Sequence, residues 1–194
     1  MPRPRHSRPT PAGVAALRRA GVAVALTAAA WALGYRDLGL GPRRAGAGAR
    51  WGIAVAAPVL AGYAAAAAVP ALRDQLATPP PASREWLLVR IPLGTVLAEE
   101  LLFRAVLDAV ATRWLGRSGA VLVGSALFGL WHRKDGAGWP TIACTAASGV
   151  PFLCLRHGSG SLVAPVLLHL AVNAGGAGLR IYGAGGFGAR FTTA

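Results

Sequence analysis

The sequence Thr95-Val-Leu-Ala-Glu99-Glu100-Leu-Leu-Phe-Arg104 places two adjacent carboxylates and an arginine inside a run that is otherwise apolar and helix-forming. The surrounding residues 86–110 are mostly Leu, Val, Ala and Ile, a composition that is compatible with lipid. A charged side chain at the centre of a bilayer costs roughly 2.5–3.5 kcal/mol on insertion scales, so an intramembrane carboxylate usually has a function. This stretch therefore predicts a membrane-spanning helix with a polar site.

Helical geometry separates the two glutamates. Glu100 and Arg104 are four residues apart, so they share a helix face in the favourable order of acid before base. Glu99 lies about 100° further round the helix and has no partner nearby in the sequence. We predict that Glu100 and Arg104 form a structural ion pair and that Glu99 is free for chemistry. The same spacing also occurs on solvated helix surfaces, but the apolar surroundings favour the catalytic interpretation.

The composition indicates a membrane protein. The chain has 194 residues, of which 54% are hydrophobic and 14% charged, which is too apolar for an ordinary soluble domain. The net charge is +13, but the arginines are spread over the ends of apolar runs, as in membrane-flanking segments and unlike a nucleic-acid-binding patch. Only Lys134 among the 20 basic residues is a lysine. With abundant Ala and Gly this indicates a GC-rich bacterial genome, and hence the bacterial cytoplasmic membrane.

The apolar runs predict an all-α fold, a polytopic transmembrane bundle of about six spans with the active site between helices. Residues 1–19 form a basic N-terminal segment, 20–85 the first two spans and their loops, 86–175 the catalytic core and 176–194 a Gly-rich C-terminal tail. The six runs are 20–33, 51–72, 86–116, 120–131, 141–155 and 161–173.

The first run has two interpretations. Its small residues near Ala30-Trp31-Ala32 are compatible with a cleaved signal peptide, and Arg18-Arg19 with a twin-arginine export signal. We favour an uncleaved first span, because the sequence that follows is more membrane protein and not a soluble passenger.

Two further apolar runs contain polar side chains one helical turn apart. Phe128-Gly-Leu-Trp-His132 pairs an aromatic ring with a histidine, and His169-Leu-Ala-Val-Asn173 pairs a histidine with an asparagine. Singly, His132 could lie at the water interface, and His169 with Asn173 could hydrogen-bond between helices. Together with Glu99 they are the groups needed to activate a water molecule and to stabilise an oxyanion.

These motifs resemble those of a known family. Glu99-Glu100-Leu-Leu-Phe-Arg104, Phe128-Gly-Leu-Trp-His132 and Gly160-Ser-Leu-Val-Ala-Pro165, leading to His169 and Asn173, are similar in order and spacing to the motifs of the CPBP family. This family comprises the CAAX-processing and bacteriocin-processing intramembrane glutamic proteases, also called the Abi family. The resemblance covers about residues 86–175. One departure is Ala105, where many members have glycine, and the first 85 residues show no family feature.

The resemblance implies a role for each residue. Glu99 would be the general base that activates a water molecule, and His132 would share that water. His169 and Asn173 would form the oxyanion hole, while Glu100 and Arg104 would hold the architecture. The implied protein is an intramembrane endopeptidase without a metal or other cofactor. Its partners would be the lipid bilayer and a membrane-associated or precursor protein substrate.

Three alternatives remain at this point. A zinc-dependent membrane protease could use Glu99, His132 and His169 as ligands, although the sequence has no HExxH motif and no Cys-rich cluster. A non-catalytic membrane immunity or scaffold factor could have the same fold. A small proton-coupled transporter is less favoured, because the chain has no evident duplicated half.

Overall fold

The structure, a computed structural model, describes residues 10–76 and 85–183 of the chain. These residues form helices joined by short loops, and no strand occurs within the two ranges, so the all-α prediction is confirmed. The elements are α1 (Pro11–Ala32), α2 (Pro42–Ala68), α3 (Pro70–Leu76), η1 (Trp86–Leu97), α4 (Ala98–Glu100), η2 (Leu101–Leu107), α5 (Asp108–Trp131), η3 (His132–Asp135), α6 (Trp139–Ser159) and α7 (Val163–Gly183).

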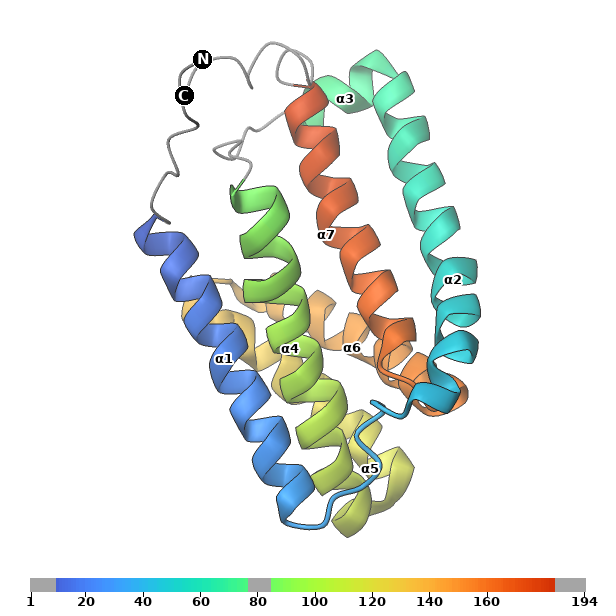
Figure 1. Cartoon of the computed structure of the whole chain (residues 1–194). Helices are drawn as coiled ribbons and strands as arrows, with labels where there is room; N and C mark the ends of the chain where they lie inside the picture. Colours follow the sequence, from blue (N-terminus) through green and yellow to red (C-terminus); the bar gives the residue numbers. More distant parts are fainter. Residues whose placement is uncertain (1–9, 77–84, 184–194) are drawn as a thin grey trace, which may run out of the picture.

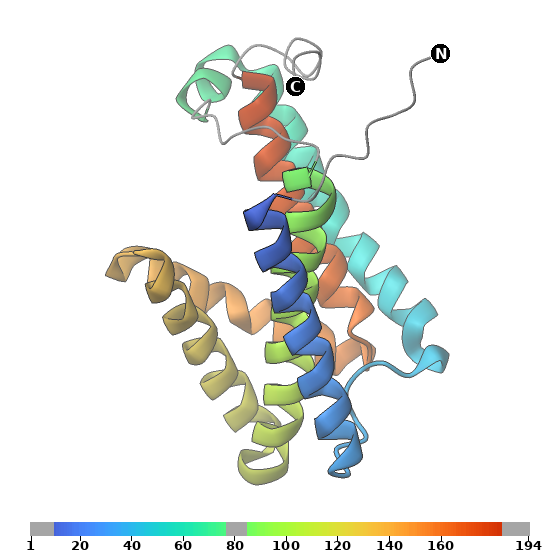
Figure 2. The ribbon, with the colours of Figure 1, turned by 60° about the vertical axis from the view of Figure 1, so that its left-hand side comes forward.

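The long helices pack in pairs (Figure 1). Helix α1 lies beside the helix that contains α4, and α2 lies beside α7. Helices α5 and α6 form a hairpin that leans away from the other helices towards its loop end, as Figure 2 shows. The elements around α4 therefore contact both α1 and α7, which makes this helix central to the bundle.

The central helix is continuous from η1 through α4 and η2 into α5. Both η1 and η2 have the wider π-type turn, which is rare and often found at functional sites. The helix breaks at Gly116, whose φ of 69° favours glycine. This break separates the two runs that the sequence predicts as the third and fourth spans.

Helices α1 and α7 extend beyond the ends that the sequence predicts for them. Helix α1 starts at Pro11, and the side chain of Thr10 caps it by accepting a hydrogen bond from the Gly13 N–H. The predicted basic segment thus contributes the first turns of α1. At the other end α7 continues to Gly183 with Ala177 and Leu179 buried, so the predicted tail begins as packed helix.

Some predictions lie outside the described residues. These are the structure of residues 1–9, of the Pro-rich loop 77–83 and of residues 184–194.

Helices α1 and α2 are long and apolar enough to cross a membrane. Both leave large apolar side chains uncovered, and Val22 and Ile53, for example, are 60% and 61% exposed. Apolar surface of this extent normally needs a covering phase such as lipid. Of the other described helices, α7 contains a shorter apolar stretch, Val163–Leu179. The prediction of six spans is therefore not confirmed.

The loop between α1 and α2 closes one end of the bundle. Gly39, with a φ of 72°, accepts a hydrogen bond of 2.8 Å from the Leu162 N–H at the start of α7. A Cβ atom at this position would lie 2.6 Å from Nε of Arg156 on α6. Only glycine allows the loop to approach α6 and α7 this closely.

Close packing between α5 and α6 gives the first prediction. A Cβ atom on Gly129 would lie 2.5 Å from the carbonyl oxygen of Ile142, so Gly129→Ala must push the two helices apart. We expect this variant to lose about 1–3 kcal/mol of unfolding free energy in detergent. Gly62→Ala is the matched control, because no atom lies within 4 Å of its added methyl group. Equal stability of the two variants would contradict the packing described here.

Candidate active site

The centre of the site is a buried ion pair on the central helix. Glu100 is 0% exposed, and its Oε1 lies 3.1 Å from Nη1 of Arg104, one turn further on. Arg104 is also fully buried. Two opposite charges at this depth are tolerable only when they neutralise each other, because each alone would have to be desolvated without compensation. The two side chains lie together as the spacing in the sequence predicts.

Aromatic rings surround the guanidinium group of Arg104. Its Cζ atom lies 4.0 Å from the ring centre of Phe128 on α5 and 4.7 Å from that of Phe152 on α6. The ring of Phe103 lies 5.9 Å away. A delocalised guanidinium is weakly hydrated and stacks favourably on aromatic faces, so these rings compensate for part of its lost hydration. Sequence analysis missed Phe152, which no motif singles out.

His169 on α7 lies between the two glutamates. Its Nδ1 atom is 2.8 Å from Oε1 of Glu100, and its Nε2 atom is 3.9 Å from Oε2 of Glu99. The first distance is a hydrogen bond and the second is too long for one. Within the described ranges Oε2 of Glu99 has no hydrogen-bond partner although it is buried. Both contacts to Glu100 are made by its Oε1, and its Oε2, like that of Glu99, has no hydrogen-bond partner within the described ranges. The two glutamates therefore differ in their partners, because Glu100 contacts both Arg104 and His169.

The other two predicted residues lie around this cluster with weaker connections. His132 hydrogen-bonds through Nδ1 to the carbonyl oxygen of Phe128 at 2.9 Å, and its ring also contacts that phenylalanine. Phe128 in turn contacts the ring of His169, with 6.2 Å between centres. Asn173 lies one turn beyond His169 and is partly exposed. Its side chain makes no hydrogen bond to any residue that the structure describes.

A cavity of about 230 Å³ opens beside Glu99. Its walls come from α1, from the central helix and from Trp131 at the end of α5. Helix α1 contributes Arg18 and Arg19, both exposed. The N-terminal helix, which shows no family feature in the sequence, thus forms one wall of the space beside the free glutamate. A substrate segment in this cavity would meet both a carboxylate and two cations.

A second buried arginine supports the site from α6. Arg156 is 1% exposed, although its place near a helix end predicts a membrane-flanking charge. Its Nε atom donates to the carbonyl oxygen of Arg104 at 3.1 Å, and its Nη2 atom donates to Oδ1 of Asp37 at 2.8 Å. The neighbouring His157 lies 2.8 Å from Oδ1 of Asp108. These contacts fasten α6 to the central helix and to the α1–α2 loop.

Metal binding receives no support from the donor groups. Among residues 10–76 and 85–183, no three His, Cys, Asp or Glu side chains are grouped so that they could hold a metal ion.

The buried ion pair gives the second prediction. Glu100→Ala leaves the positive charge of Arg104 buried without its carboxylate, so we expect a loss of about 3–5 kcal/mol in unfolding free energy. The double variant Glu100→Leu with Arg104→Met removes both charges and should lose clearly less. Chemical unfolding in detergent measures both. A double variant that is less stable than Glu100→Ala would contradict a role of the pair in mutual neutralisation.

Comparison with known proteins places this site in a family. Residues 81–175 match the family model described as type II CAAX prenyl endopeptidase, Rce1-like. No curated protein and no solved structure matches the chain. The matched region extends from the start of the central helix into α7 and includes both glutamates, Arg104 and the histidines of the site. Through residues 81–175 the chain belongs to the Rce1-like family, a family of membrane-embedded CAAX proteases.

Proposed function

We propose that this protein is a multi-pass endopeptidase of the bacterial cytoplasmic membrane that hydrolyses a peptide bond with water activated by Glu99. One observation supports the proposal above all. His169 and Arg104 pair with Glu100, which is fully buried, while the neighbouring Glu99 lines a cavity. A structural role would not require a second carboxylate at this depth, because each one must be desolvated.

The proposed reaction begins with a water molecule held against the carboxylate of Glu99 in the cavity. The carboxylate removes a proton from the water while the water oxygen attacks the carbonyl carbon of the substrate, forming a tetrahedral oxyanion. Glu99 then gives this proton to the leaving nitrogen as the C–N bond breaks. The products are a carboxylic acid and an amine, and Glu99 returns to its ionised form. His132, which contacts the same aromatic ring as His169, would orient the water.

His169 would stabilise the oxyanion through Nε2, the nitrogen that faces Glu99. Because Nδ1 hydrogen-bonds to Glu100, donation from Nε2 requires a ring that is protonated on both nitrogens. Glu100 would therefore act on the reaction through His169 as a positioning residue, and Asn173 one turn further on would supply a second donor.

The family description favours a lipidated protein C-terminus as the substrate, since the matched model is that of a CAAX prenyl endopeptidase. The cavity beside Glu99 fits this choice, because the exposed Arg18 and Arg19 at its wall complement a carboxylate. A secreted peptide precursor is the other substrate class that we consider for this site.

The third prediction tests the general base. Purified protein in liposomes should release the last three residues from a prenylated CAAX peptide, and Glu99→Gln should abolish this release. Glu85→Gln, the same chemical change at the start of η1, should retain activity. New N-termini in isolated membranes, mapped by mass spectrometry, provide a second readout that needs no chosen substrate.

Each outcome of that experiment is decisive. Equal processing by wild type and Glu99→Gln would refute the role of Glu99, and no processing by wild type in either readout would refute the peptidase. Activity that persists with a strong chelator present is expected, while its loss and recovery with zinc would favour the metalloprotease alternative.

The fourth prediction concerns Asn173. A donor to an oxyanion is typically worth roughly 10²–10³-fold in rate, so Asn173→Ala should lower kcat by about that factor. Because the side chain is partly exposed, the unfolding temperature should hardly change. Val172→Ala, at the exposed preceding position of α7, is the matched control and should keep full activity. Unchanged turnover of Asn173→Ala would exclude the oxyanion role.

A non-catalytic scaffold factor is the second candidate function. The observation in its favour is that Glu100 and Arg104 on the central helix contact His169 on α7 and Phe152 on α6. These contacts would join the three helices even if no reaction took place. For a scaffold, Glu99→Ala should lower the amount of folded protein, and any remaining function should scale with that amount. For a peptidase, Glu99→Gln should be folded and inactive.

A further inference from the structure

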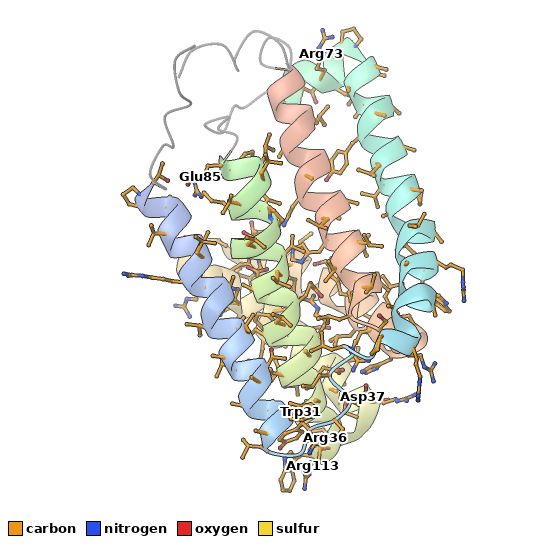
Figure 3. All side chains as sticks on the ribbon, in the orientation of Figure 1. Trp31, Arg36, Asp37, Arg73, Glu85 and Arg113 are labelled. Carbon is orange, nitrogen blue, oxygen red and sulfur yellow. The ribbon has the colours of Figure 1, made fainter. Side chains whose placement is uncertain are left out.

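A second and larger cavity lies at the end of the bundle that the α1–α2 loop closes. Its volume is about 610 Å³. Its walls come from that loop, from the start of α2, from the central helix near Gly116 and from the turn between α6 and α7. Figure 3 shows three of its residues, Arg36, Asp37 and Arg113, gathered at this end. It shares no lining residue with the cavity beside Glu99.

Positive charge dominates this cavity. Five arginines line it against two aspartates, Asp37 and Asp108, and the arginines are Arg36, Arg44, Arg113, Arg117 and Arg156. Both aspartates already have partners, because Asp37 pairs with Arg156 and Asp108 with His157. Partial burial by itself would raise the pKa of Asp37, but the hydrogen bond and the charge of Arg156 outweigh it and hold this pKa below its usual value. The ionised Asp37 is thus already neutralised.

The remaining four arginines have no carboxylate within ion-pair distance among the residues that the structure describes. All four side chains are exposed, so none of them is part of the packed core. Two are held in place by aromatic rings. Arg36 lies over the ring of Trp31 at 4.3 Å and Arg113 over the ring of Tyr35 at 5.4 Å. The cavity therefore presents several cations, two of them positioned before any ligand arrives.

Helix α2 adds a second source of positive potential. It begins at Pro42 beside the cavity, which Gly41 and Arg44 line. Its first turn contains no acidic residue, and no side chain caps it. Pro42 has no N–H, and the Arg44 N–H donates to the Gly41 carbonyl oxygen, so the first turn offers mainly the positive end of the helix dipole. This positive potential favours a bound anion, and an arginine in the first turn opposes the dipole. A bound anion would interact favourably with the helix dipole and with the arginine of the first turn.

The level of this cavity in a membrane follows from two tryptophans. Trp31 at the end of α1 is 58% exposed, and Trp114 beside the break at Gly116 is 75% exposed. Exposed tryptophans at helix ends mark the headgroup region of a bilayer. Trp31 stacks on Arg36, and Trp114 follows Arg113, so a bilayer whose headgroups meet these two tryptophans would have its phosphates level with the basic cavity.

We propose that this cavity binds the phosphate group of an anionic molecule, supplied either by a membrane lipid or by a soluble phosphate. Phosphate suits the site because arginine donates to its oxygens in a fixed fork and the dipole of α2 adds positive potential. Basic pockets between helices are known as headgroup sites for anionic lipids. Bound there, the phosphate would link the α1–α2 loop, the start of α2 and the central helix at the closed end of the bundle. The proposal is independent of the peptidase activity, since Glu99 has no part in it.

The test uses the full chain in an uncharged detergent. Phosphatidylglycerol, phosphatidylcholine and inorganic phosphate are titrated separately, and binding is measured by the rise in unfolding temperature and by native mass spectrometry. Wild type and Glu99→Gln should bind phosphatidylglycerol equally and phosphatidylcholine more weakly. The double variant Arg36→Gln with Arg113→Gln should weaken phosphatidylglycerol binding by about 10- to 30-fold.

The matched control is Arg50→Gln with Arg133→Gln, which removes the same charge at exposed positions outside the cavity. This control should bind within about twofold of wild type. Arginine-dependent binding of phosphatidylglycerol alone identifies a lipid, and the same dependence with inorganic phosphate identifies a soluble ligand. No binding in any arm, or equal losses in both double variants, would overturn the proposal.

Discussion

A buried ion pair in an apolar helix bundle is the constraint on which this structure depends. Glu100 and Arg104 are both fully buried, and neither charge could remain at this depth alone. Their neutralisation fixes where the surrounding helices may lie. Phe128 and Phe152 must present ring faces to the guanidinium, and His169 must present a nitrogen to the carboxylate. One pair thereby positions α5, α6 and α7 around the central helix.

The same interaction explains why adjacent glutamates differ. Glu100 is held through its Oε1 by both Arg104 and His169, whereas Glu99 lies 3.9 Å from Nε2 of His169 and lines a cavity. A side chain that is held in place but not satisfied is suited to hold and transfer a proton. The paired glutamate and the glutamate that lines the cavity thus occupy neighbouring positions of one helix.

The two cavities also differ in the charges of the residues that line them. The space beside Glu99 combines a carboxylate with the two exposed arginines of α1, so it can face groups of either sign. The cavity at the closed end of the bundle has arginines in excess and no free carboxylate among the described residues. Arg156 lies between the two regions, because it donates both to the Arg104 carbonyl oxygen and to Asp37. Its burial connects the end of the bundle to the ion pair.

The sequence by itself determined the helical class and the pairing of Glu100 with Arg104, because these follow from hydrophobic runs and from spacing within one helix. It also placed the break near Gly116. It could not place Arg156, Phe152 or α1 at the site, nor gather the arginines of the closed end, because these residues are far apart in the chain and belong to no local pattern. Only the tertiary structure decided them, since the energy of a buried charge depends on which distant groups surround it.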